Sequence, residues 1–121
     1  MSAGVYDIVV EQGASFDLDI QLNHTSGEAK DLTGYSVRGK IRATAPGVEI
    51  VSFTATVVSV SGGMIHIALT PTQTTALVTT GASHAQYEEY VYDVEIYTSA
   101  DAIVERVLNG RCLVSPEVTR T

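Results

Sequence analysis

Strict alternation of apolar and polar residues, repeated along most of the chain, restricts this sequence to a β fold. In residues 16–22 the side chains at every second position are Phe, Leu, Ile and Leu, and acids and a glutamine lie between them. Successive side chains of a strand point to opposite faces, so such a segment buries one face and exposes the other. The same pattern predicts strands at residues 6–10, 35–43, 50–60, 64–69, 90–96, 103–108 and 111–114.

Turn signals separate these segments. Ser61-Gly62-Gly63 stands between two alternating runs, and it predicts a hairpin because glycine reaches positive φ without steric cost. Seven or eight short strands at this spacing predict an all-β fold, namely an antiparallel β-sandwich of the immunoglobulin or fibronectin type. A small closed barrel is the alternative. The 121 residues suit one domain, residues 1–121, with short extended tails at residues 1–4 and 116–121.

One segment departs from the alternation. Thr70 is followed by Pro71 and, three positions after the threonine, by Gln73. The threonine hydroxyl can cap a helix, proline fits the first helical position, and the glutamine side chain can reach back to the cap. We expect one or two helical turns that cross between the sheets, anchored by Leu77.

The composition argues against several classes of function. Fourteen acids against seven bases give a net charge of −7, whereas broad binding to nucleic-acid phosphates needs clustered Lys and Arg. The longest aliphatic run is Ile8-Val9-Val10, so we expect no membrane insertion. The single cysteine, Cys112, can form no intrachain disulfide, which favours folding in a reducing cytoplasm. We expect it to be a small buried residue of a strand.

No combination of residues predicts catalysis or a cofactor. His24, His66 and His84 do not have the spacing of a metal-ligand pair. Asp17 and Asp19 share one strand face, where they could bind a divalent cation, although solvated carboxylates are the simpler interpretation. The expectation is therefore no catalytic, cofactor or metal site.

A row of bases is more informative. Arg38, Lys40 and Arg42 alternate along one strand and form a positive stripe on an acidic chain. These bases could pair with acids of the same sheet, or they could meet acids of a neighbouring subunit. Contact with nucleic acid is a third and weaker alternative.

The tyrosines divide between the two faces of the segment 90–96. Tyr90 and Tyr92 share parity with its aliphatic residues and should point inward, while Tyr87 and Tyr97 should lie on the other face. An exposed amphipathic aromatic side chain suits an interface. The complete set of interface candidates is Tyr6, Arg38, Lys40, Arg42, Tyr87, Tyr97, Pro116 and Arg120.

Six short stretches, in order along the chain, carry a resemblance. They are YDIVVEQGA (6–14), DLTGY (31–35), GKIR (39–42), YVYDVE (90–95), RVLNG (106–110) and VSPEVTR (114–120). Taken together, they resemble small virion structural proteins of tailed bacteriophages. The DLTGY stretch is also similar to the N-terminal immunoglobulin-like domains of phage baseplate upper proteins.

This resemblance implies a non-enzymatic virion component that acts through protein–protein contacts. It implies a tail, baseplate or fibre-attachment adaptor, made in the cytoplasm of a host bacterium, that forms homo-oligomers and joins other virion proteins. It implies no cofactor and no active site. A capsid decoration protein and a module that binds a host-surface glycan or protein are the alternatives. A small hydrolase or metal enzyme has only scattered carboxylates in its favour.

Overall fold

The computed structural model describes residues 4–24, 26–44, 47, 49–79, 83 and 85–117. The strands in this part of the chain are β1 (Gly4–Val5), β2 (Ile8–Glu11), β3 (Phe16–Gln21), β4 (Ser36–Arg42), β5 (Glu49–Ser52), β6 (Thr54–Ser59), β7 (Met64–Leu69), β8 (Glu88–Tyr97) and β9 (Val104–Ser115). One helical turn, α1 (Pro71–Thr75), and one 3₁₀ turn, η1 (Ser99–Asp101), complete the described elements. Neither is long and apolar enough to cross a membrane.

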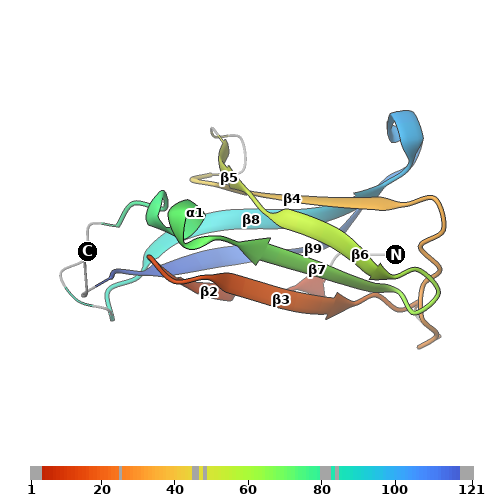
Figure 1. Cartoon of the computed structure of the whole chain (residues 1–121), viewed down its shortest axis with the longest axis horizontal. Helices are drawn as coiled ribbons and strands as arrows, with labels where there is room; N and C mark the ends of the chain where they lie inside the picture. The colour runs from red at the N-terminus through yellow and green to blue at the C-terminus, as the bar shows by residue number, and fades with distance from the viewer. Residues whose placement is uncertain are drawn as a thin grey trace.

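The strands form two sheets that pack face to face (Figure 1). The larger sheet has the order β1-β9-β8-β4-β5, with β2 also paired to β9, and the smaller sheet has the order β3-β7-β6. The prediction of an all-β sandwich is confirmed. Apolar side chains of both sheets join one buried cluster, which includes Ile41 and Val94 of the larger sheet and Ile65 and Ile67 of the smaller.

The predicted strand at residues 50–60 is wrong as a single element, because the chain changes sheets at Phe53. β5 pairs with β4 in the larger sheet, whereas β6 pairs with β7 in the smaller one. The Phe53 ring lies between the sheets, with centroids 6.3 Å from Phe16 and 6.1 Å from Tyr92. A Cβ on Gly39 would come within 2.9 Å of this ring, so the glycine provides the space into which the corner residue packs.

The two strands predicted at residues 103–108 and 111–114 are one continuous strand, β9. Asn109 and Gly110 lie inside it rather than in a turn. A bulge interrupts its pairing with β8, since Val94 pairs with Leu108 but the next residue, Glu95, pairs with Arg106. Val107 is the extra residue, and a bulge of this kind resets which side chains face outward.

The N-terminal strands β1 and β2 pair with β9 in parallel, an arrangement that the antiparallel sandwich prediction does not include. Ile8 pairs with Cys112 and Val10 with Val114, and all four side chains are buried. Gly4, expected in the tail, belongs to β1. The other strand pairs of the described residues are antiparallel.

The predicted capping box is present at α1, which joins β7 of the smaller sheet to β8 of the larger. The Gln73 backbone N–H donates to Thr70 Oγ1 (3.2 Å), and the Thr70 backbone N–H donates to Gln73 Oε1 (2.9 Å). Leu77 is fully buried, as expected for the anchor. Thr74 is also fully buried, and the burial of its hydroxyl is tolerated because the hydroxyl donates a hydrogen bond to Ala14 O (2.9 Å).

Candidate functional site

Three rows of outward side chains cross the outer face of the larger sheet, each with one residue from β4, one from β8 and one from β9. We call this surface the charged groove. Its rows are Arg38–Glu95–Arg106, Lys40–Asp93–Asn109 and Arg42–Val91–Arg111. The groove thus gathers five of the seven lysines and arginines of the chain.

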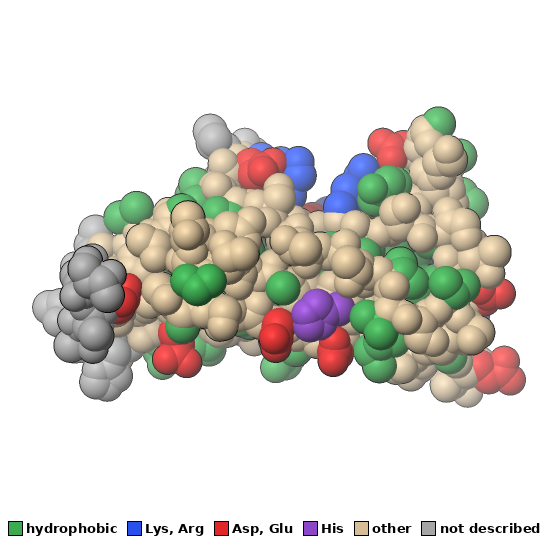
Figure 2. Space-filling model, viewed as in Figure 1, with side chains coloured by type: hydrophobic (Ala, Val, Ile, Leu, Met, Phe, Trp, Pro, Cys, Tyr) green, Lys and Arg blue, Asp and Glu red, His purple; other side chains and the backbone are tan. Residues whose placement is uncertain are grey.

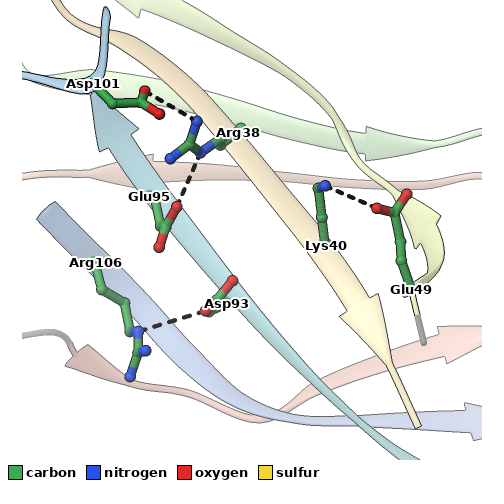
Figure 3. Close-up of polar contacts among 7 residues, drawn as sticks. All are labelled: Arg38, Lys40, Glu49, Asp93, Glu95, Asp101 and Arg106. Atoms are coloured by element: carbon green, nitrogen blue, oxygen red, sulfur yellow. Dashed lines mark hydrogen bonds and ion pairs between the residues drawn. The ribbon is translucent and has the colours of Figure 1, made fainter. Parts of the chain in front are cut away.

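The first row is an ion-pair network (Figure 3). Arg38 Nε lies 3.0 Å from Glu95 Oε1, and Arg38 Nη1 lies 3.4 Å from Asp101 Oδ1 at the β8–β9 turn. The guanidinium also stacks on Tyr97, with Cζ 4.3 Å from the ring centroid. The hydrogen bond to Glu95 raises the pKa of Arg38 above its usual value. Two carboxylates and an aromatic ring therefore hold this cation in place.

The second row has two ion pairs that lead in different directions (Figure 3). Lys40 Nζ reaches 2.8 Å to Glu49 Oε1 on β5, while Asp93 Oδ2 lies 3.5 Å from Arg106 Nε on β9. Burial, followed by the nearby Glu95 charge, raises the pKa of Asp93. The floor of the groove is therefore partly shielded from water.

The third row differs because its central residue, Val91, carries no charge. On one side Arg111 contacts Asp7 through Nη2 (2.7 Å) and Nε (3.1 Å), and its Nη1 lies 3.6 Å from Glu89. On the other side Arg42 Nη1 donates to Gly47 O (2.8 Å). Within the part of the chain that the structure describes, no carboxylate lies within ion-pair distance of Arg42.

A hollow of about 410 Å³ lies over this part of the sheet, and one of about 240 Å³ lies beside it. Figure 2 shows cationic side chains in a recess between two projections, one at β5 and one at the β8–β9 turn with η1. Asn109 lines the larger hollow, and its Oδ1 is a buried oxygen without a hydrogen-bond partner among the described residues. The lining of the larger hollow is Val5, Lys40, Arg42, Val91, Tyr92, Asp93, Arg106, Asn109, Gly110 and Arg111.

The sequence identifies the row on β4 but misses Arg106 and Arg111. These arginines are five residues apart, so a regular strand would place them on opposite faces. The bulge at Val107 brings both to the outer face. Of the alternatives for the basic row, pairing with acids of the same chain is realised at Arg38 and Lys40.

The remaining predicted residues lie elsewhere. Tyr87 is exposed just before β8, and Pro116 follows the end of β9. Tyr90 and Tyr92 point into the core as predicted. Arg120 and His84 lie outside the described residues.

The acidic pair of β3 lies on the outer face of the other sheet. Asp17 and Asp19 are both exposed, and Asp19 Oδ1 is 2.5 Å from Nδ1 of His66, its partner on β7. Among the described residues, no group of three or more His, Cys, Asp or Glu side chains has a geometry that could hold a metal ion.

A second surface lies at the open edge of the sandwich. Val5, Tyr6 and Val9 are 81%, 52% and 50% exposed, and they lie on or between β1 and β2, which pair on one side with β9. A groove of about 250 Å³ runs beside them, lined by Tyr6, Asp7, Ile8, Val9, Phe16 and Leu18. We call this surface the apolar edge.

No family model matches the chain, and no curated protein sequence matches it. The fold and its surfaces therefore define the class of the protein: a small all-β sandwich with a charged groove on its larger sheet and an apolar edge.

Proposed function

We propose that this protein is a non-enzymatic structural component of a tailed-phage virion that acts through protein–protein contacts, as a tail, baseplate or fibre-attachment adaptor. The stretches described above support a phage origin through their resemblance to small virion proteins. The observation that carries an assembly role is the apolar edge, where three large apolar side chains of one short segment face solvent.

Such an edge is suited to binding another chain. Within the described residues, β1 and β2 have a strand partner only in β9, so the backbone groups on their other side remain open to pairing. Unpaired edges add strands from other chains, and the side chains beside them provide specificity. The groove between β2 and β3 offers the partly buried side chains of Phe16 and Leu18 to such a strand.

The experiment is sedimentation velocity of the purified protein, alone and mixed with the virion proteins encoded beside it. We expect self-association or a complex, and we expect Val9→Lys at the apolar edge to weaken at least one of them. Val58→Lys is the control, because Val58 is 60% exposed on β6 of the other sheet. A strictly monomeric protein that joins no virion component would contradict the proposal.

The location within the particle needs a second measurement. A density map of the virion with a 12.9 kDa sandwich assigned to the tail or baseplate supports the adaptor role. The same density on the capsid surface would instead make the protein a decoration protein that acts through similar contacts.

A further inference from the structure

The charged groove has a regular pattern with one interruption. On β8, Glu95 lies between Arg38 and Arg106, and the next outward residue, Asp93, lies between Lys40 and Asn109. Continuing the pattern would place an acid between Arg42 and Arg111, but the residue there is Val91. The third row thus has one guanidinium group on each side of an apolar residue.

Arg42 is the cation that would gain most from an added carboxylate. Its hydrogen bond is to the neutral oxygen Gly47 O, and the carboxylates of Glu49 and Asp93 act on it only from beyond ion-pair distance. Arg111, in contrast, already has Asp7 and Glu89 as direct partners. Neighbouring strands are about 4.8 Å apart, so the backbones of Arg42 and Arg111 are separated by about 10 Å. This width and the hollow above Val91 leave room for an acidic side chain from outside the molecule.

The chain itself displays suitable acids on its opposite sheet. Asp17 and Asp19 project from β3, and Figure 2 shows acidic side chains and a histidine along this side of the smaller sheet, away from the cationic recess. Two residues along a strand span about 6.8 Å. The two aspartates therefore have the same spacing as Lys40 and Arg42, which also lie two residues apart on one strand.

We propose that the charged groove of one copy binds the Asp17/Asp19 face of a second copy, with a carboxylate over Val91 beside Arg42. This inference rests on the proposed function, because it specifies how the structural component self-associates. The two surfaces lie on opposite sheets, so the contact is head-to-tail. Repetition of a head-to-tail contact produces a ring if the rotation closes and a filament if it does not.

The net charge of −7 does not oppose this contact. At physiological ionic strength the Debye length is about 8 Å, so charges far from the contact are largely screened. Local complementarity then decides the encounter and fixes the register. The association should weaken as salt is raised from about 0.1 M to about 1 M, where the Debye length falls to about 3 Å.

The test uses two variants that each remove a different half of the contact. Arg42→Glu disables the groove but keeps the acidic face, whereas the double variant Asp17→Asn/Asp19→Asn removes the charge of the acidic face but keeps the groove. We expect each variant alone to self-associate at least about tenfold more weakly than the wild type in sedimentation velocity. A mixture of the two should form a 1:1 dimer that does not grow, because one functional interface remains.

Matched controls separate loss of the contact from loss of the fold. Arg42→Lys keeps the charge and should retain association. Glu28→Lys makes the same net charge change as the double aspartate variant, but in an exposed loop, and should also retain association. Far-UV circular dichroism checks that each variant is folded. Variants that associate like the wild type, or a mixture that forms no dimer, would overturn the inference.

The failure of this inference is distinguishable from failure of the proposed function. A wild type that is monomeric alone but binds neighbouring virion proteins overturns the head-to-tail contact and leaves the structural role intact. A wild type that joins no virion component and does not self-associate overturns both.

Discussion

At the residue scale, the buried amide of Gln12 connects three segments that are far apart in sequence. Its Nε2 donates to Leu77 O (3.2 Å) after α1, and its Oε1 accepts from the Glu117 backbone N–H (3.1 Å) after β9. Its own backbone N–H donates to Ser115 O (3.0 Å). A buried polar group is tolerated when its hydrogen bonds are made, and removing one partner leaves the others unpaired at a cost.

Gln12→Ala should therefore reduce the free energy of unfolding by about 1–3 kcal/mol, since it leaves the Leu77 carbonyl and the Glu117 N–H without this side chain. Urea denaturation followed by circular dichroism measures the change. Glu28→Ala, at an exposed loop residue, is the control and should change it by less than about 0.5 kcal/mol. Equal losses in the two variants would refute the role of Gln12.

The buried Cys112 thiol predicts a pH dependence. Burial raises the pKa of Cys112 to about 12, and it also raises the pKa of Tyr92 above its usual value. Both groups are more easily ionised in the unfolded chain, so stability is fully present below their unfolded pKa values and decreases as pH rises past them. The urea midpoint should fall as pH increases from about 8 to about 11.

Thiol reactivity gives an independent check of the same burial. A disulfide reagent such as 5,5′-dithiobis(2-nitrobenzoate) attacks the thiolate, so the native protein at about pH 8 should react far more slowly than the same protein in denaturant. Rapid reaction of the native protein would show that Cys112 is not enclosed.

At the scale of elements, the close approach of the N-terminal segment to β9 depends on one glycine. A Cβ at Gly110 would lie 2.3 Å from Tyr6 O. The Tyr6 backbone N–H also donates to Asn109 O (2.8 Å), and its carbonyl accepts a hydrogen bond from the Tyr92 hydroxyl. A side chain at position 110 would push the link between β1 and β2 off the sheet.

Gly110→Ala should lower the free energy of unfolding by about 1–3 kcal/mol, as overpacked sites do. Hydrogen exchange should show faster exchange of the β2 amides than in the wild type. Gly4→Ala is the matched control on the neighbouring strand, because its Cβ would meet its nearest atom, Leu108 Cδ1, at an ordinary 3.6 Å. Unchanged exchange in β2 after Gly110→Ala would contradict this interpretation.

The sequence predicts the elements whose signals are local. Alternation finds β3, β4 and β7, and the Thr70 to Gln73 spacing finds the capping box of α1. The sequence does not show that the chain changes sheets at Phe53, because the residues before and after Phe53 both have the pattern of a strand. Asn109-Gly110 resembles a turn, and only contact with Tyr6 shows why a glycine lies inside a strand.

The same limit applies to the candidate site. Residues two apart on β4 form a visible row, but Arg106 and Arg111 join it through a bulge and through pairing across β8. Register between distant strands is a tertiary property that alternation alone does not specify. The parallel pairing of β2 with β9 cannot be predicted from the sequence for the same reason.

At the scale of the whole molecule, one core without a disulfide must provide the stability. The buried cluster contains residues of both sheets, and the only cysteine of the sequence is buried and free. Layers that share one core unfold together in most single domains of this size.

Thermal unfolding should therefore be a single transition whose calorimetric and van 't Hoff enthalpies agree, at about 85 kcal/mol near 60 °C for a chain of this length. A reducing agent should leave the transition temperature unchanged. Two resolved transitions, or a shift on reduction, would show that the sheets do not form one cooperative unit.

The pairing of β2 with β9 also bears on how the chain reaches its native state. Ile8 must find Cys112, so the chain closes a loop of roughly one hundred residues to form this contact, and contacts of such long sequence separation slow folding. During synthesis, which proceeds from the N-terminus, β1 and β2 emerge first and wait until β9 has been made. Their apolar side chains stay open to other nascent chains for that interval, so the yield of folded protein should depend on how fast translation proceeds.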